Sequence, residues 1–305
     1  MKQITFLSWK TPDEWTPLLE PEGVVCSSCY KCASSFIVAS IRTLWYKMKL
    51  PMAQIWFSSI VKNHKGIIVL HDVMINVKIF EYLRKNNPDA KLILYYINNI
   101  SGKNNYIDQA RNCNWDVWTF NPADAEKYRL KINHLFYSNV FFEKFKTDLP
   151  DIYDIVFIGR DKGRMGYVQS LASHPALKDL KWYLYFVAHP FYKRYNKKAY
   201  KKYMPYERLL EIQNRSTAIL EIQHEDGKGA TQRTIEALYF KKKLITTNKY
   251  LQHMDYYHPN NIFILDVDDI NTLPDFLDVP YHPINPGIVS QYSLESWLNK
   301  FIQSE

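Results

Sequence analysis

The segment from Ser216 to Asn248 constrains the fold of this chain more than any other. It opens with an apolar run of strand length, Ala218 to Ile222, which a polar, glycine-containing loop follows. A run of helix length then extends from Ala230 to Phe240, and a second apolar run, Leu244 to Thr247, comes after it. Strand, loop, helix and strand in this order form the unit of a parallel sheet that is covered by helices.

The loop and first helical turns of this unit carry groups that suit an anionic ligand. In parallel sheets, ligands bind beyond the carboxyl ends of the strands, where loop amides and a helix N-terminus meet. Gly229 allows close backbone approach, Thr231 lies at the helix start, and Arg233 can bind phosphate through two hydrogen bonds. Glu236 can accept hydrogen bonds from a ribose. The sequence predicts a diphosphate and ribose site, although a plain turn beside a surface arginine fits the same residues.

A second polar loop follows the apolar run Ile155 to Ile158. Its sequence is Gly-Arg-Asp-Lys-Gly-Arg, from Gly159 to Arg164. Because it also follows a predicted strand of the same sheet, Gly159, Arg160 and Lys162 are candidates to contact the same diphosphate from the opposite side. The two loops together predict a bipartite anion site.

Composition is that of a globular protein that binds something anionic. Of 305 residues, 47% are hydrophobic and 23% are charged, and the chain is long enough for two domains. The net charge is +8 and the pI is near 9.0, which favours a nucleotide, nucleic acid, anionic lipid or acidic polysaccharide as partner.

Apolar runs and helical periodicity alternate along both halves of the chain. We expect a Rossmann-like domain over residues 1–149, a second over 150–285, and a C-terminal helix within 286–305 that crosses back to the first domain. A long loop is expected over 9–26. The predicted strands are 2–8, 67–70, 92–97, 115–120, 155–158, 182–187, 218–222, 244–247 and 262–265. The predicted helices include 33–48, 73–85, 106–112, 165–173 and 293–302.

A run rich in lysine and tyrosine, from Tyr192 to Tyr203, predicts a surface helix. Its tyrosines would share one face and its cations the rest, which is typical of a helix resting on anionic lipid but also of a solvated helix. The chain has no apolar run of about 18 residues and no secretory signal, so we expect a cytoplasmic location, peripheral on the inner membrane face if this helix binds lipid. The cations of this lysine- and tyrosine-rich run, which would contact the lipid, are Lys193, Arg194, Lys197, Lys198, Lys201 and Lys202.

Polar residues near strand ends of the first half are candidates for a general base. Asp13 lies in the long first loop, and His71 and Asp72 follow a buried strand. A histidine next to an aspartate at a strand end can equally be structural. The three residues are therefore catalytic candidates without a ranking.

The sequence does not predict a metal site. Cys26, Cys29 and Cys32, with Cys113, have spacings that invite a metal interpretation, but no histidine pair or following proline completes a known pattern. The run from Asp266 to Asp268 follows a late strand and is interpreted as a turn.

Four segments resemble the second domain of GT-B fold glycosyltransferases, and more narrowly bacterial enzymes of lipopolysaccharide-core, capsule or exopolysaccharide assembly. These segments are Tyr153 to Arg164, Leu209 to Leu238, Lys242 to Asn248 and Tyr256 to Leu265. The first half matches only in general pattern. The resemblance implies two Rossmann-like domains facing across a cleft, with a nucleotide-sugar donor on the second and an acceptor on the first.

The resemblance also implies roles for the residues of the two loops. Arg160 and Lys162 would neutralise the diphosphate leaving group, Gly229, Thr231 and Arg233 would bind its oxygens, and Glu236 would hold the ribose. Positive side chains would replace a metal ion, so we expect a metal-independent enzyme without a cofactor.

One departure from the family pattern affects the stereochemistry. Many retaining members have a glutamate eight positions before the one that matches Glu236, but Lys228 stands there. Inverting and retaining chemistry both remain open.

The sequence therefore predicts a glycosyltransferase of hexosyltransferase type that acts on a lipid-linked or growing surface glycan. A nucleotide-sugar epimerase and a non-enzymatic protein that binds anionic surfaces or nucleic acid are the alternatives. Cations at strand ends suit a small phosphate ligand better than a long duplex, so we do not expect nucleic acid as the partner.

Overall fold

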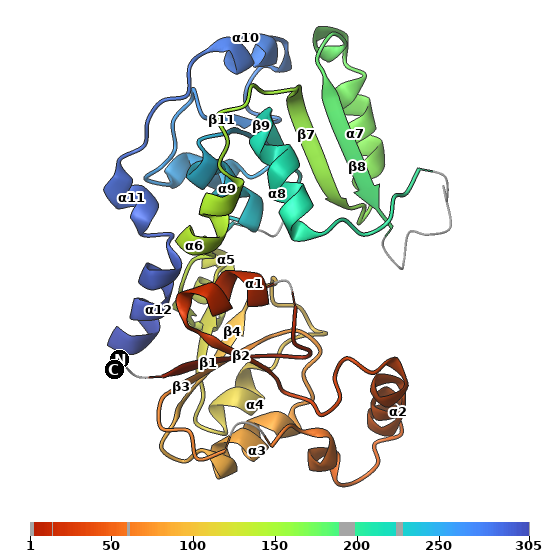
Figure 1. Ribbon diagram of the computed structural model, residues 1–305, viewed down its shortest axis with the longest axis vertical. Coiled ribbons are helices and arrows are strands. Elements are labelled where there is room, and N and C mark those ends of the chain that lie inside the picture. The colour runs from red at the N-terminus through yellow and green to blue at the C-terminus, as the bar shows by residue number, and fades with distance from the viewer. Residues whose placement is uncertain (1–2, 14, 60–61, 189–198, 224–227, 305) are drawn as a thin grey trace. The chain divides into compact units, whose positions relative to one another are not determined.

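The chain forms two compact units in a computed structural model that describes all residues except 1–2, 14, 60–61, 189–198, 224–227 and 305 (Figure 1). The first unit comprises Met1–Phe141 with Leu294–Glu305, and the second comprises Phe142–Ser293. This division falls a few residues before the boundary suggested at Leu149. Both units are built on parallel sheets, so the predicted pair of α/β domains is confirmed.

In the described part of the first unit, a six-stranded parallel sheet has the strand order β2-β1-β3-β4-β5-β6. Its strands are β1 (Ile4–Ser8), β2 (Val25–Ser28), β3 (Ile67–His71), β4 (Lys91–Tyr96), β5 (Asp116–Thr119) and β6 (Lys131–Ile132). Its helices are α1 (Thr16–Leu19), α2 (Phe36–Lys47), α3 (Lys78–Asn86), α4 (Ile107–Arg111), α5 (Pro122–Tyr128) and α12 (Leu294–Gln303), and α6 (Asn139–Phe142) spans the division.

Alternate side chains of these strands enter two different cores. Leu7, Leu70 and Leu94 point to the face that α3 and α4 cover, where they meet Phe80 and Ala110. Because side chains alternate along a strand, the residues between them face the other way. Strands β1, β3 and β4 are buried on both faces, which explains their nearly continuous apolar sequences.

The opposite face of the first sheet packs against α12. Trp297 is 2% exposed, and its ring centroid lies 4.7 Å from Phe136 and 5.3 Å from Tyr95. Phe301, one turn later, lies 5.0 Å from Trp118. The C-terminal helix therefore returns to the first unit, as the sequence suggested.

We expect Trp297→Ala to lower the free energy of unfolding by about 3–5 kcal/mol, because it empties a large buried site. Urea denaturation checks this value. Asn299→Ala, an exposed change on the same helix, should stay close to the parent. Equal stability of the two variants would contradict the packing role of α12.

In the described part of the second unit, a five-stranded parallel sheet has the order β11-β10-β9-β7-β8. Its strands are β7 (Tyr153–Arg160), β8 (Trp182–Val187), β9 (Ser216–Glu221), β10 (Lys243–Thr246) and β11 (Ile262–Ile264). Its helices are α7 (Met165–Ala172), α8 (Tyr206–Asn214), α9 (Gln232–Phe240), α10 (Leu273–Asp278) and α11 (Pro286–Ser290).

The second sheet is also buried on both faces. Phe157, Leu220 and Ile245 share a core with Val168 of α7 and Phe276 of α10. Helices α8 and α9 contact the sheet at β9, and α9 also contacts β10. The segment from Ser216 to Asn248 thus forms β9, α9 and β10, with parallel pairing of the two strands.

Several local expectations need correction. The long loop expected over 9–26 contains α1 and the start of β2, and α8 was not expected. Helix α2 begins at Phe36 rather than Ala33, because the Ser35 hydroxyl accepts a hydrogen bond from Val38 N at 3.4 Å and caps the helix. Helix α3 begins at Lys78 rather than near Val73.

The lysine- and tyrosine-rich run is not helical where it is described. Tyr192 to Lys198, with Lys193, Arg194 and Lys197, lie outside the described residues. Lys201 pairs with Val187 as an isolated parallel bridge, and its N–H donates to Phe186 O at 2.8 Å. Lys201 and Lys202 are exposed on this extended segment. The expected helical face cannot continue to Tyr203.

Candidate functional site

A buried carboxylate organises the carboxyl edge of the second sheet. Glu221 ends β9 and is 1% exposed. It accepts hydrogen bonds from the hydroxyls of Thr231, of Thr234 at 3.3 Å, and of Thr246 at 2.7 Å. These donors come from the start of α9 and the end of β10. Since a buried charge needs such partners, Glu221 links helix and strands at this edge.

The start of α9 is held by two further sets of hydrogen bonds. Thr231 caps the helix by accepting from Arg233 N at 3.2 Å, and its own N–H donates to the Thr234 hydroxyl at 3.3 Å. The carbonyl of Gly229 accepts from the side-chain amides of Asn248 and Gln223, both at 3.2 Å. The N-terminus of α9 is thereby fixed at the carboxyl edge of the sheet, where helix amides favour an anion.

Two arginines converge beside this helix start. Arg233 Nη2 donates to Ile158 O, and Arg164 donates to the carbonyls of Ile222 at 2.7 Å and Arg160 at 2.6 Å. Both guanidinium groups lie against the Phe157 ring, at 5.9 and 5.5 Å from its centroid.

Neither arginine forms an ion pair with a carboxylate in the described part of the chain, although the charges of Asp161 and Glu221 partly favour the charged form of Arg164. Burial, together with the charge of Arg233, lowers the pKa of Arg164 to about 10. Arg233 Nε is buried and has no hydrogen-bond partner among the described residues. Two adjacent, partly buried cations repel each other, so an anion bound between them would relieve that repulsion.

Gly159 provides the space for this pair. A Cβ atom at this position would lie 2.6 Å from Arg233 Nη2 and 3.7 Å from Arg164 Nη2. Any larger residue would therefore displace the Arg233 guanidinium. The structure thus brings Gly159 and Arg233 of the predicted set together.

Arg160 and Lys162 lie at the other side of the same loop. Both are exposed, and Lys162 has a φ of 45° in a tight turn that the hydrogen bond from Arg164 N to Asp161 O closes at 2.8 Å. Asp161 is buried and accepts from Met165 N at 2.8 Å, which fixes the start of α7. The turn leaves Arg160 and Lys162 at the carboxyl end of β7.

Glu236 is buried about one turn into α9. Its Oε1 accepts from the Tyr206 hydroxyl of α8 at 2.7 Å, while Oε2 has no hydrogen-bond partner among the described residues. Burial raises the pKa of Glu236 to about 7, although the Tyr206 hydroxyl and the charge of Arg233 lower it in part. The carboxyl group is therefore partly protonated near neutral pH.

This pKa predicts a pH-dependent stability. The unfolded chain ionises Glu236 near 4.5 and the folded chain near 7, so the folded state loses stability as pH rises through this window. We expect wild type to lose about 3 kcal/mol relative to Glu236→Gln between about pH 5 and pH 8.

Urea denaturation of both proteins across that range measures the difference. Glu207→Gln on α8 replaces an exposed glutamate and should show no such pH dependence. A gap between wild type and Glu236→Gln that stays constant with pH would contradict the raised pKa.

In the first unit, Asp13 and His71 meet at the carboxyl edge of the sheet. His71 Nε2 lies 3.4 Å from Asp13 Oδ2, and the His71 ring stacks on Phe6 at 5.5 Å. Asp13 Oδ1 also accepts from the backbone of Trp15 and Thr16, both at 3.0 Å, and so fixes the start of α1. Burial raises the pKa of Asp13, but His71, together with hydrogen bonds from the Trp15 N–H and Ser8, outweighs it and the net shift is downward.

Asp72 has a different role from its neighbour. It accepts from Ile97 N at 2.9 Å and from the side-chain amides of Asn98 and Asn104 at 3.2 and 3.1 Å. Burial raises its pKa, and these donors only partly oppose the shift. Asp72 therefore ties together the loop after β4.

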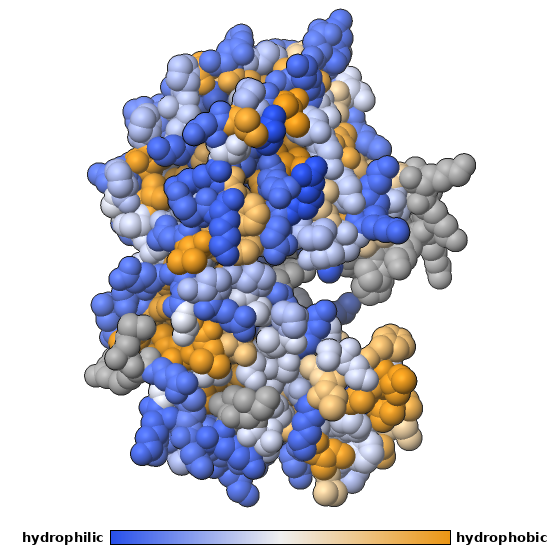
Figure 2. Space-filling view, viewed as in Figure 1, coloured by the Kyte–Doolittle hydropathy of each residue, from blue (hydrophilic) through white to orange (hydrophobic). Residues whose placement is uncertain are grey.

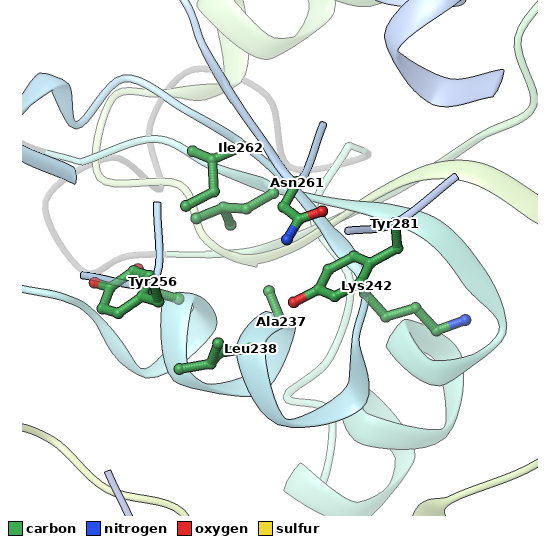
Figure 3. A pocket seen from close by; sticks show the side chains of 9 residues that line it. Ala237, Leu238, Lys242, Tyr256, Asn261, Ile262 and Tyr281 are labelled. Carbon is green, nitrogen blue, oxygen red and sulfur yellow. The ribbon is translucent and has the colours of Figure 1, made fainter. Parts of the chain in front are cut away.

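A small cavity beside α9 is not the ligand site. Figure 3 shows Tyr281, Asn261 and Lys242 on one side of it and Tyr256 on the other. Its volume is about 10 Å³, room for about one water molecule. Lys242 and Asn261 precede β10 and β11, so the cavity lies toward the amino edge of the sheet, opposite the loops described above.

Metal-binding side chains do not gather anywhere in the described part of the chain: no group of three or more His, Cys, Asp or Glu residues could hold an ion. Cys26 and Cys113 are partly exposed, Cys29 is buried and Cys32 is exposed. Asp268 accepts from Ile264 N at 2.6 Å and closes the turn after β11.

Comparison with known proteins gives fold similarity without sequence similarity. No protein-family model matches the sequence, and no curated protein matches it. A glycosyltransferase from Rickettsia africae matches over the full length of both chains at 12% identity and a TM-score of 0.50. The Anabaena protein HepE, solved in complex with UDP, matches over 100% of this chain and 99% of its own at 10% identity and a TM-score of 0.54.

A third structure matches over both units as well. The UDP-forming α,α-trehalose-phosphate synthase from Burkholderia xenovorans aligns over 99% of this chain and 98% of its own, at 11% identity and a TM-score of 0.57. The chain has the GT-B fold. Because so few residues are identical, these matches show that the fold is shared. They do not show that the residues of a binding site are shared.

Three side chains that shape this site are not among the predicted site residues. Arg164 belongs to the predicted basic loop without a role of its own, and the sequence assigns no role to Glu221 or Tyr206. A charged residue at the end of an apolar strand run, followed by threonines at the start of the next helix and at the end of the next strand, is the signal that could have identified Glu221. Residues 224–227 of the predicted loop lie outside the described part.

Proposed function

We propose that this protein is a glycosyltransferase that binds a nucleotide-sugar donor on its second unit and transfers the sugar to an acceptor on its first. The observation that carries the proposal is the pair Arg164 and Arg233 beside the N-terminus of α9. The GT-B fold supports it, and one protein of similar fold was solved with UDP bound.

The chemistry of sugar transfer fits this pair. When the bond between the sugar and the diphosphate breaks, negative charge develops on the leaving nucleoside diphosphate. Fixed cations and helix amides that stabilise this charge lower the barrier. Arg233 and Arg164 would supply the cations, and Arg160 and Lys162 at the end of β7 would add charge nearby.

The loop before α9 would contribute through its backbone. Because the Thr231 hydroxyl already donates to Glu221, Thr231 would act by fixing the helix start and Gly229 by allowing the phosphate to approach. Glu236 Oε2 lacks a partner among the described residues and would accept from a ribose hydroxyl. With the arginines meeting the diphosphate charge, we propose that transfer needs no metal ion, so activity should persist in EDTA.

The acceptor site belongs to the first unit in this proposal. His71 would accept the proton of the acceptor hydroxyl as its oxygen bonds to the sugar carbon and the nucleoside diphosphate departs. Asp13 would orient His71 and stabilise the imidazolium that forms. We propose a lipid-linked or growing surface glycan as acceptor, in line with the sequence resemblance to lipopolysaccharide and capsule enzymes.

We expect Arg233→Ala and Gly159→Ala each to weaken binding of the nucleoside diphosphate by about tenfold to a hundredfold, because a charge-assisted hydrogen bond contributes about 1.5–3 kcal/mol. Gly159→Ala tests geometry alone, since it displaces the Arg233 guanidinium and leaves the charge unchanged. Calorimetric titration with UDP, GDP, TDP and CMP identifies the base and gives the affinities.

The control is Arg208→Ala, which removes an exposed arginine of α8 and should bind the nucleotide as wild type does. Unchanged affinity in both site variants would refute the donor site. Binding of nucleic acid without any response to nucleotides would favour the anionic-surface alternative, and donor conversion without an acceptor would favour an epimerase.

We expect His71→Ala to lower the rate of sugar transfer by about a hundredfold or more, because general-base catalysis contributes about that much. Donor affinity should not change, since the residue lies in the other unit. Asp13→Asn keeps the Oδ1 acceptor that fixes α1 but removes the charge facing His71, and should lower the rate less. A transfer rate that survives His71→Ala would eliminate this residue as the base.

A further inference from the structure

Helix α2 presents apolar side chains to solvent and buries a cation. Phe36, Ile37 and Leu44 are 85%, 70% and 57% exposed, whereas Arg42 is 4% exposed and lies 4.2 Å from the centre of the Tyr30 ring. A surface helix of a globular protein normally has the opposite pattern, with its apolar stripe on the core. No described part of the chain covers the exposed apolar face of α2.

We name the exposed apolar residues of α2 and of the segment directly after it the α2 patch. Residues 37, 41, 44 and 48 are spaced three or four apart, so they line one side of the helix and its C-terminal end. Figure 2 shows the patch as a hydrophobic cluster over α2. Its members are Phe36, Ile37, Ile41, Leu44, Met48 and Met52, each at least half exposed. Large exposed patches of this kind mark interaction sites.

The charge around the patch identifies the kind of partner. No aspartate or glutamate occurs from Gly23 to His71, a stretch that contains six cations. Lys47 and Lys49 are exposed at the C-terminal end of α2. Lysines beside an apolar helix face complement an anionic lipid surface, where apolar side chains enter the interface and lysines meet headgroups.

We infer that α2 binds the interfacial region of an anionic phospholipid bilayer. The helix has 12 residues, fewer than the roughly 20 that span a bilayer, and none of the described helices is long and apolar enough to do so. The α2 patch would thus lie in the plane of the interface. The inference does not depend on the transferase reaction, and it assigns membrane contact to the first unit rather than to the lysine- and tyrosine-rich run.

Vesicle flotation of the full chain tests this inference without donor or acceptor. Wild type should bind vesicles of phosphatidylcholine and phosphatidylglycerol in equal parts more strongly than vesicles of phosphatidylcholine alone. The double variant Ile37→Gln/Leu44→Gln should bind the anionic vesicles at least about tenfold more weakly, since each side chain loses its apolar burial. Lys47→Glu/Lys49→Glu should also weaken binding and reduce its dependence on salt.

The matched control is Leu149→Gln/Val267→Gln, which replaces two exposed apolar residues outside the patch and should bind vesicles as wild type does. The apolar residues replaced in the patch variant and in the control are all exposed. Neither double variant should therefore change the thermal unfolding of the protein or its affinity for nucleotides. Equal vesicle binding by wild type and the patch variant, or none by either, would overturn the inference. Patch-dependent self-association without vesicle binding would also overturn it and identify a second copy as the partner.

Discussion

The hydrogen bonds that three threonine hydroxyls donate to the buried carboxylate of Glu221 hold the second unit's candidate ligand edge together. They join β9 to the start of α9 and the end of β10. Because Thr231 also caps α9, the same network sets where Arg233 leaves the helix. The approach of Arg233 to Arg164 over Phe157 therefore depends on a residue that would not itself touch the ligand.

Sequence reasoning predicted most of the parallel strands, because most of them are short apolar runs whose side chains are largely buried. It missed β2, whose residues Val25–Ser28 are polar or exposed and depend on pairing with β1. In the site, it placed Gly159 in a loop and Arg233 in the first turns of a helix, without showing their contact. It could not show that Glu221 joins β9 to α9 and β10, because the Thr246 hydroxyl comes from another strand. It also could not show that Asp72 accepts hydrogen bonds from two asparagine side chains.

The proposed roles of the two units follow from where each unit places its charged residues and what those residues contact. The second unit places cations at a helix start, against backbone carbonyls rather than carboxylates in its described part. The first unit pairs Asp13 with His71 at its own sheet edge and has an acid-free stretch around α2. A donor diphosphate, an acceptor hydroxyl and an anionic bilayer are the three partners that these features suit. A glycosyltransferase working on lipid-linked acceptors would need all three.

The most direct test of the central claim is a crystal structure with the nucleoside diphosphate that binds most strongly. We predict phosphate oxygens within hydrogen-bond distance of Arg233, next to Arg164 and the backbone N–H groups at the start of α9. A diphosphate bound elsewhere, with both guanidinium groups paired instead to carboxylates of the chain, would contradict it.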